Sequence, residues 1–254
     1  MSSNSETGHS KNVKNAFEYV QVVKGYGTEY GPGNSEISLA ALTDKQSTCQ
    51  KVYDAWVNAD GVYTPVEQLR INKYAPLDKL VRGTMKEYAS FDPDKLEKAG
   101  LKSIADKITG NNVKRHSAEK KKKEKEAKAA GLPVPTEADY HSVAQLSYDM
   151  KLTNFNEFLV GLKNSTIYKP TTVKYKLAAL QAVYDDLFAV NESVKAAYPA
   201  YSNSLLERNK EMYDEKTGLL HLIELSKNYV EGLYADNKPK AKLELRIKFR
   251  KLTK

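Results

Sequence analysis

The sequence has little of the chemistry that identifies several common classes of protein. Its 254 residues contain a single cysteine, Cys49, so no internal disulfide bond can form, and no set of cysteines and histidines has the spacing of a zinc site. No apolar run approaches the roughly 18 residues that a membrane-spanning helix needs, and residues 1–10 lack the apolar stretch of a secretory signal. We therefore expect a cytoplasmic protein and exclude a disulfide-rich scaffold, a zinc finger and an integral membrane protein.

Recognisable catalytic patterns are also absent. Residues 25–33 are rich in glycine, but no predicted strand precedes them and no Gly-Lys-Ser/Thr sequence follows, which indicates a loop between helices rather than a phosphate-binding loop. Glu207 and Glu211 lie four residues apart, but the Glu-x-x-His motif of a carboxylate metal site is missing. Cys49 lies on an apolar stripe, which favours a buried residue over a nucleophile. The sequence thus predicts no enzyme, no metal site and no cofactor.

Positive charge is concentrated in two segments. The formal net charge is +8, but residues 111–130 carry +5 and residues 238–254 carry +7, which leaves −4 for the rest of the chain. Such runs are most often solvated helices or tethers, and they can also bind phosphate groups through electrostatic attraction. If the chain binds nucleic acid, we expect the contacts to come from the cations of these segments, in particular Lys120, Lys121, Lys122, Lys123, Lys248 and Arg250.

An internal repeat is the most informative pattern in the sequence. Residues 39–42, Leu-Ala-Ala-Leu, recur 138 positions later as residues 177–180. The same offset relates further identical pairs: Phe17 and Phe155, Val22 and Val160, Thr28 and Thr166, Tyr30 and Tyr168, Pro32 and Pro170, Ala59 and Ala197, Tyr63 and Tyr201, and Arg70 and Arg208. Beyond Arg70 the offset grows slightly, so that Tyr74 matches Tyr213. We infer that the chain contains two related repeats.

Each repeat has the apolar spacing of amphipathic helices. In the second repeat a stripe at steps of three and four residues is formed by Leu177, Leu180, Tyr184, Leu187, Val194 and Tyr198. We expect helices near residues 12–26, 39–63, 65–89 and 93–109 in the first repeat, and near 154–164, 177–198 and 200–234 in the second. Pro76 and the pair Thr217-Gly218 are expected to kink or break the chain.

The predicted fold class is all-α: two tandem related helical bundles of three to four helices each, with a possible short C-terminal β-strand. We expect a disordered N-terminus over residues 1–11 and a first bundle over 12–110. A charged linker rich in lysine, glutamate and alanine follows over 111–139, then a second bundle over 140–236 and a basic, extended tail over 237–254.

The possible strand lies at residues 241–249, where apolar and charged side chains alternate. A period of two is the signal of a strand, and its apolar positions are Ala241, Leu243, Leu245, Ile247 and Phe249. A single strand must find a neighbour. Extended packing on its own domain, pairing with another subunit, addition to a partner's sheet and a helical conformation remain open.

Two arginines and two tyrosines are the candidate binding residues. Arg70 and Arg208 are the charged pair that the repeats share, and an arginine beside apolar helical positions either pairs with a carboxylate, caps a helix or recognises an anionic ligand. Tyr63 and Tyr201 belong to a total of 17 tyrosines, a residue type that suits bundle ends and interfaces. We take these four residues as candidate ligand- or partner-binding residues.

The C-terminal part of the sequence resembles a group of uncharacterised bacterial helical proteins. The resemblance rests on Arg208-Asn-Lys-Glu-Met-Tyr213, Thr217-Gly-Leu219 and Lys227-Asn-Tyr-Val230, followed by Ile247-Lys-Phe249, which match the pattern R-N-x3-Y … T-G-L … K-x-Y-V. It covers about the last 50 residues, and the first repeat retains Arg70 and Lys86-Glu-Tyr88. The resemblance implies a soluble bacterial protein and no particular activity.

Duplication without duplicated chemistry predicts a non-enzymatic helical scaffold or protein-interaction module. Apolar stripes, tyrosines and one arginine recur between the repeats, whereas no acid, base, nucleophile or metal-binding group does. We expect a protein partner or self-association. The alternative is a nucleic-acid- or ribosome-associated protein that binds through the basic linker and tail. A pore-forming or membrane-surface protein is a third reading, for which no long hairpin with an apolar tip is present.

Overall fold

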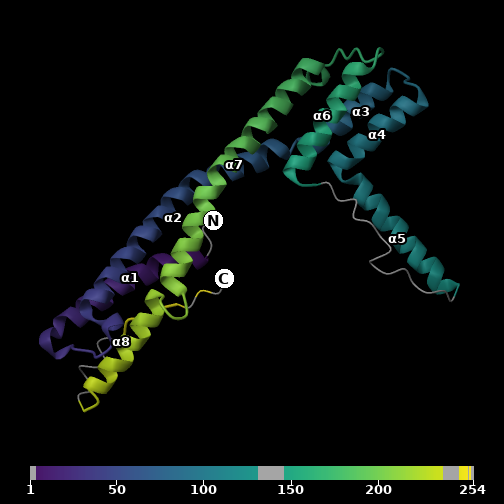
Figure 1. Ribbon diagram of the computed structural model, residues 1–254. Coiled ribbons are helices and arrows are strands. Elements are labelled where there is room, and N and C mark those ends of the chain that lie inside the picture. The colour runs from purple at the N-terminus through teal and green to yellow at the C-terminus, as the bar shows by residue number, and fades with distance from the viewer. Residues whose placement is uncertain (1–3, 131–145, 237–245, 251, 253–254) are drawn as a thin grey trace. The chain divides into compact units, whose positions relative to one another are not determined.

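The protein forms an all-α structure (Figure 1). The computed structural model describes residues 4–130, 146–236, 246–250 and 252, and these residues contain helices and turns but no β-strand. The helices are α1 (Asn4–Gly25), α2 (Leu39–Tyr74), α3 (Leu77–Ala89), α4 (Lys95–Thr109), α5 (Asn111–Ala129), α6 (Tyr148–Asn164), α7 (Leu177–Tyr213) and α8 (Leu219–Leu233). The all-α class predicted from apolar spacing is confirmed. Among the described helices, none has both the length and the apolar character needed to cross a membrane.

Two of the expected chain breaks are confirmed. α3 begins directly after Pro76, and α8 begins directly after Gly218. Proline lacks a backbone N–H and its ring clashes with the preceding turn, so a helix often ends there. Before α8, the Asp214 carboxylate accepts hydrogen bonds from the backbone N–H groups of Lys216 and Thr217, which closes the turn.

The expectation of separate helices beginning near residues 65 and 200 is wrong. α2 continues through Pro65 and α7 through Pro199, giving helices of 36 and 37 residues. One proline removes one helical hydrogen bond, and a helix can continue past it with a kink. Thr64, the residue best placed to cap a helix at Pro65, instead donates its hydroxyl to Asp60 Oδ1 at 2.9 Å, one turn back.

The chain divides into two compact units that do not coincide with the two repeats. Unit 1 comprises residues 1–64 and 197–254, and unit 2 comprises residues 65–196. The tandem bundles expected over 12–110 and 140–236 are therefore replaced by units that each combine the first part of one repeat with the second part of the other. The length of α2 and α7 is the reason, because each helix continues past its proline and its second part packs outside the unit that holds its first part.

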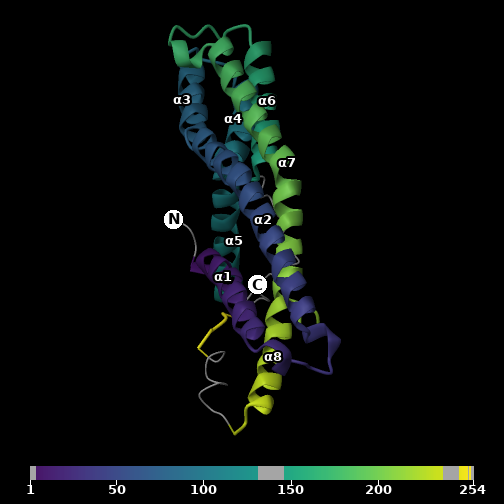
Figure 2. The ribbon, with the colours of Figure 1, turned by 90° about the vertical axis from the view of Figure 1, so that its left-hand side faces the viewer.

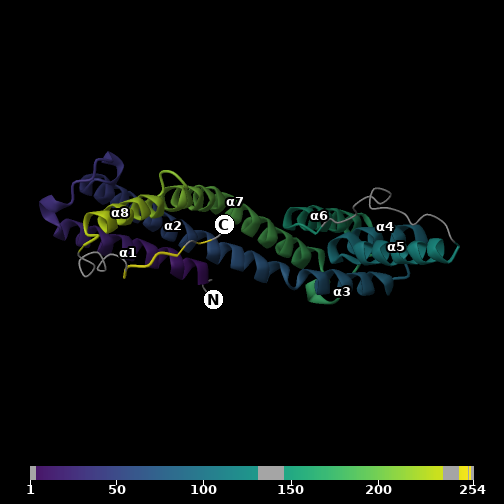
Figure 3. The ribbon, with the colours of Figure 1, turned by 90° about the horizontal axis from the view of Figure 1, so that it is seen from below.

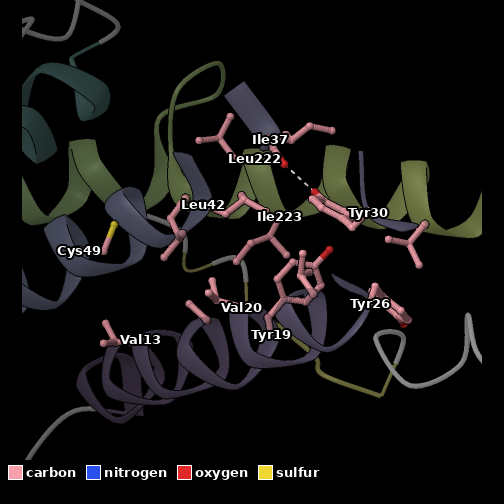
Figure 4. Close-up of a cluster of buried hydrophobic side chains, with 14 of the residues drawn as sticks. Val13, Tyr19, Val20, Tyr26, Tyr30, Ile37, Leu42, Cys49, Leu222 and Ile223 are labelled. Atoms are coloured by element: carbon pink, nitrogen blue, oxygen red, sulfur yellow. Dashed lines mark hydrogen bonds between the residues drawn. The ribbon is translucent and has the colours of Figure 1, made fainter. Parts of the chain in front are cut away.

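Unit 1 has a core built by α1, α8 and the adjoining parts of α2 and α7 (Figure 4). Figure 4 shows Val13 and Val20 of α1 on one side of the cluster and Leu42 of α2 and Ile223 of α8 across from them. The hydroxyl of Tyr19 donates to Ser226 Oγ at 2.7 Å, which satisfies a fully buried phenol. Apolar burial from four helices thus fixes the position of α1.

Unit 2 contains α3, α4, α5, α6 and the remaining parts of α2 and α7. Helix α4 packs against both α3 and α6 (Figure 2). Its buried residues Leu101, Ala105 and Ile108 share one apolar cluster with Phe155 of α6. Gly161 of α6 permits the close approach, because a Cβ atom at this position would lie 2.6 Å from Leu101 Cδ2.

Positions 138 residues apart make matching contacts in the two units. The Tyr30 hydroxyl donates to the Ile37 carbonyl at 2.6 Å in unit 1, and the Tyr168 hydroxyl donates to the Tyr175 carbonyl at 2.6 Å in unit 2. In each unit this bond ties the loop before the long helix to the 3₁₀ turn that leads into it. Three further pairs at the same offset are buried in both units: Leu42 and Leu180, Cys49 and Leu187, and Val52 and Val190.

The expected N-terminal disorder is wrong for residues 4–11, and the expected linker is largely helical. α1 begins at Asn4, and His9 is 7% exposed because its ring packs against Tyr213, 204 positions along the chain. No local pattern can predict such a contact. Helix α5 covers residues 111–129 of the linker expected over 111–139, and residues 131–139 lie outside the described residues.

The described part of the C-terminal tail, residues 246–250, is neither helix nor strand. It lies along α1 (Figure 3), where Ile247 and Phe249 pack against the unit 1 core. Among the alternatives left open by the sequence, extended packing on its own domain is what these residues show. Residues 241–245 of the expected strand lie outside the described residues.

Candidate interaction surfaces

Arg208 is a buried cation in unit 1. Its side chain projects from α7, is 3% exposed, and places the guanidinium carbon 4.1 Å from the ring centroid of Trp56 on α2. Its Nη2 and Nε atoms donate to Asn209 Oδ1 at 2.8 and 3.2 Å. A planar guanidinium stacked on an indole is held by cation–π attraction and by packing of its flat face. Arg208 therefore joins α2 to α7 inside unit 1.

His9 and Tyr213 complete the surroundings of Arg208. His9 Nδ1 lies 2.6 Å from the Tyr213 hydroxyl, and the His9 ring lies 6.1 Å from Trp56 in an edge-on arrangement. Burial, with a smaller contribution from the positive charge of Arg208, lowers the pKa of His9 from 6.5 to about 4. Burial raises the pKa of Tyr213 to about 12. Near neutral pH the imidazole and the phenol are both uncharged beside a charged arginine.

Arg70 occupies the matching position in unit 2. Its guanidinium carbon lies 4.3 Å from the ring centroid of Tyr148, at the start of α6, and its Nη2 pairs with Glu67 Oε2 at 2.5 Å. Both arginines thus lie over an aromatic ring within their own unit. The ion pair with Glu67 gives Arg70 a structural role that is common for an arginine beside apolar helical positions.

Tyr63 and Tyr201 stack on each other in unit 1. Their ring centroids lie 4.5 Å apart with an interplanar angle of 11°, and Tyr198 lies 5.8 Å from Tyr63. Over residues 57–64 of α2 and 197–204 of α7 no residue is buried, and we call these two segments of unit 1 the two-helix layer. We define the tyrosine surface as the stacked pair with the exposed apolar and aromatic residues beside it: Tyr63, Tyr201, Tyr198, Val57 and Leu206.

The basic candidates fall into two separate groups. Lys121, Lys122 and Lys123 are exposed on α5 of unit 2 and Lys120 is half-buried there. Lys248 and Arg250 belong to unit 1, where both side chains are exposed on the tail. The structure does not assemble the six cations into one site within a single unit.

An open cavity of about 830 Å³ lies beside Arg208 in unit 1. Its lining combines the imidazole of His9 with cations, carboxylates and aliphatic side chains: Arg208, Lys210, Lys216, Asp214, Glu215, Leu205, Leu206 and Leu252, with Asn209 and Tyr213. Such a mixed lining has no arrangement typical of one class of ligand. Among the described residues, no group of three or more His, Cys, Asp or Glu side chains is placed to hold a metal ion.

Cys49 lies in the unit 1 core, as its apolar surroundings in the sequence indicate. It is fully buried, its Sγ donates to the Glu211 carbonyl at 3.4 Å, and burial raises the pKa of its thiol to about 12. A thiol with so high a pKa is almost entirely protonated at neutral pH and is a poor nucleophile. The chemistry around Cys49 is that of a core residue.

Sequence reasoning missed the residues that surround Arg208. His9, Trp56 and Tyr213 come from three helices and meet only in the folded unit. Two signals in the sequence were available: Trp56 is the single tryptophan, and Tyr213 matches Tyr74 in the other repeat. Neither signal identifies His9, because Ser147 stands 138 positions later.

Comparison with known proteins gives no relative from which to transfer a function: no family model, no curated protein and no solved structure matches the chain. The resemblance to uncharacterised bacterial helical proteins stays a prediction. The functional argument therefore rests on the surfaces described above.

Proposed function

We propose that the chain is a non-enzymatic protein-interaction module, a helical scaffold that binds another protein through the tyrosine surface. The observation that carries this proposal is the exposure of apolar and aromatic side chains around the Tyr63–Tyr201 stack, where residues 57–64 and 197–204 contain no buried residue in the described part of unit 1. Protein interfaces are enriched in tyrosine, which combines a large apolar area with a polar tip. The stacked pair is already ordered, which lowers the entropy cost of binding.

The geometry of a two-helix layer favours a helical partner. Helical bundles bury apolar faces between three or more helices, and an amphipathic helix laid along two others completes such a core. The partner we propose presents a helix with apolar residues at steps of three and four. Val57, Tyr198 and Leu206, which are 43%, 52% and 64% exposed, are the side chains that such a helix would cover.

Site-specific photo-crosslinking tests this proposal. A photoreactive amino acid is placed at Val57 or, as the matched control, at Val62, which is 61% exposed on another face of the same helix. We expect one discrete crosslinked protein from Val57 and none from Val62. The purified partner should then bind the unmodified chain, and Tyr198→Glu should weaken binding about tenfold or more, because it places a charge in the apolar interface. Equal crosslinking from both positions, or affinity unchanged by Tyr198→Glu, contradicts the proposal.

Binding of a polyanion such as nucleic acid is a second candidate, and the outward face of the tail favours it. Ile247 and Phe249 pack inward, whereas Arg246, Lys248 and Arg250, which alternate with them along the tail, are exposed. Salt titration with mixed RNA and duplex DNA tests this candidate. We expect affinity that falls linearly on a log–log salt plot with a slope of about −0.7 to −0.9 per phosphate contacted, and a shallower slope for the double variant Lys248→Gln, Arg250→Gln. Weak binding that is independent of salt rejects it.

A further inference from the structure

Helix α5 projects from the rest of unit 2. It leaves the end of α4 at Gly110 and runs away from α3 and α6 (Figure 1). Asn112, near its start, is buried, whereas no side chain is buried over residues 117–129. Alanine is the only apolar residue type in this stretch. Since neither a core nor an apolar interface holds this part of the helix, its charged side chains determine what it can bind.

One side of α5 carries four exposed lysines. We define the lysine strip by these residues: Lys121, Lys122, Lys125 and Lys128. Each of the others lies three or four residues from Lys125, which places all four on one side of a helix with 3.6 residues per turn. The glutamates of residues 117–129 lie at the edges of this side. The strip is therefore a line of positive charge about 10 Å long along the helix axis.

Little negative charge neutralises the strip within the chain. Among the described residues its one ion pair joins Lys122 Nζ to Glu126 Oε1 at 3.7 Å, and these side chains are 77% and 64% exposed. An exposed pair of this kind contributes little to stability. Lys125 has lysines three or four residues away in both directions and no glutamate at those spacings. Because like charges at such spacings destabilise a helix, the strip points to a counter-charge from outside the chain.

The helix regroups the lysines that form a run in the sequence. Lys120 is half-buried, as are Glu124 and Ala127, which lie four and seven residues after it on the same flank. Lys123 is exposed, but it stands two residues from Lys125 and so points to the other side of the helix. A ligand that lies along the strip therefore contacts Lys125, which the run of residues 120–123 does not include, and leaves Lys120 and Lys123 uncontacted.

The charge spacing of the strip fits a line of phosphate groups. Phosphates follow each other about every 3.4 Å along one strand of duplex DNA, so a strip of about 10 Å reaches three or four of them. Residues 117–129 contain no arginine, asparagine or glutamine, the side chains that most often read base edges. They also lack the large apolar residues that a membrane-surface helix or the centre of a protein interface buries.

We propose that the lysine strip of α5 binds the phosphate backbone of double-stranded DNA without preference for base sequence. The strip belongs to unit 2, whereas the tyrosine surface and the C-terminal tail belong to unit 1, so this contact is independent of both. Because residues 117–129 have no buried side chain, a duplex can approach the strip without any change in the core of unit 2.

Salt titration with charge-matched variants tests the proposal. The full-length chain is titrated against fluorescent duplex DNA of mixed sequence at about 50 to 200 mM salt. The test variant carries Lys121→Gln and Lys125→Gln. The matched control carries Lys120→Gln and Lys123→Gln, which removes the same charge from the same helix outside the strip. Glutamine favours a helix about as well as lysine does, so both variants should keep α5, and circular dichroism checks this.

We expect the DNA affinity of the test variant to fall about tenfold or more at about 50 mM salt, and its log–log salt slope to become shallower by about 2, because two phosphate contacts are lost. The control should lose about threefold or less. The contrast should persist when both variants also carry Lys248→Gln and Arg250→Gln, which separates the strip from the tail.

Three outcomes overturn the proposal. The first is equal loss of DNA affinity in the test variant and the control. The second is DNA binding by the test variant at the affinity of the unmodified chain, or no DNA binding by the unmodified chain at about 50 mM salt. The third is a strip that is needed for binding to phosphatidylcholine vesicles with about 30% phosphatidylserine but not for binding to DNA, which would assign the strip to a membrane surface.

Discussion

Helices α1 and α6 occupy matching places in the two units but are covered differently. One flank of α6 is buried and shares an apolar cluster with α4, and its residues are Leu152, Phe155, Leu159 and Leu162. The positions 138 residues earlier in α1 are all exposed, and they are Lys14, Phe17, Gln21 and Lys24. Three of these four positions are therefore polar in α1. The continuous apolar flank of α6 packs against α4, and α1 has no such continuous flank.

The neighbouring flank shows the opposite difference. Asn12 and Asn15 of α1 bind the tail backbone, whereas Met150 and Thr153 of α6 are exposed. A few side chains on each flank therefore decide what covers α1 and α6: another helix, an extended segment or solvent. The matching hydrogen bonds of Tyr30 and Tyr168 show that the loop before the long helix is held in the same way in both units.

The largest expected contrast lies between the two phenylalanines that match at the 138-residue offset. Phe155 is fully buried and Phe17 is 53% exposed. Phe155→Ala should lower the free energy of unfolding by about 3–5 kcal/mol, because it leaves a cavity in the core. Phe17→Ala should change it by less than about 0.5 kcal/mol. Urea denaturation of both variants measures the contrast, and losses of equal size would contradict the assigned burial.

The two arginines give the next contrast. Arg208→Ala removes a buried guanidinium from the Trp56 ring and from Asn209, and should lower the free energy of unfolding by about 2–3 kcal/mol. Arg70→Ala removes a half-buried group and a local pair with Glu67, and should cost about 1 kcal/mol. Denaturant midpoints of the two variants measure this difference. A larger loss of unfolding free energy for Arg70→Ala than for Arg208→Ala would contradict the expected order.

Acid should destabilise unit 1 through His9. The folded-state pKa of His9, about 4, is below its ordinary value of 6.5. The uncharged imidazole therefore contributes fully above about pH 6.5, and this contribution is lost as the pH falls from 6.5 towards 4. We expect a loss of about 2 kcal/mol between pH 7 and pH 4.5 that is absent from His9→Gln.

Hydrogen exchange locates this effect, because the position that matches His9 in unit 2 is Ser147, the N-cap residue of α6, whose side chain does not ionise. Amides of α1 should lose protection on acidification before those of α6, and the difference should shrink in His9→Gln. Equal loss of protection in both helices, or an unchanged pH dependence in the variant, would assign the acid sensitivity to other groups.

The smallest contrast concerns Asn15 of α1, which binds the backbone of the C-terminal tail. Asn15→Ala removes the amide that donates to the Lys248 carbonyl and should cost about 1 kcal/mol, with faster exchange of the amides of residues 246–250. Thr153→Ala, at the matching position of α6, is the control and should be nearly neutral. Exchange rates in the tail that are unaffected by Asn15→Ala would show that Asn15 does not hold it.

The sequence was sufficient for those parts of the fold that depend on local signals. Leu-Ala-Ala-Leu marks the start of α2 and of α7, and the breaks at Pro76 and Gly218 follow from proline and glycine chemistry. The continuation of α2 through Pro65 was not predictable in this way, because it depends on whether Thr64 caps a new helix or bonds backwards to Asp60.

Which segments of the chain form each unit depends on tertiary packing, and apolar periodicity in the sequence does not predict it. Lys45 and Glu211 lie in different repeats, and Lys45 Nζ pairs with Glu211 Oε2 at 2.6 Å within unit 1. No local sequence pattern predicts this ion pair. The candidate arginines and tyrosines were recognisable because they recur, whereas His9 has no counterpart in the other repeat and was assigned to a disordered segment.

An intramolecular crosslink between positions 45 and 211 tests directly that each unit is built from both repeats. Full-length chain carrying Lys45→Cys and Glu211→Cys is treated with a short bis-maleimide at low concentration, with Lys45→Cys and Glu192→Cys as the control, because Glu192 lies 19 residues before Glu211, about 28 Å along α7. We predict efficient crosslinking within the monomer for the first pair and about tenfold less for the control. Equal crosslinking of both pairs, or none for positions 45 and 211, would contradict the division into units and favour separate tandem bundles.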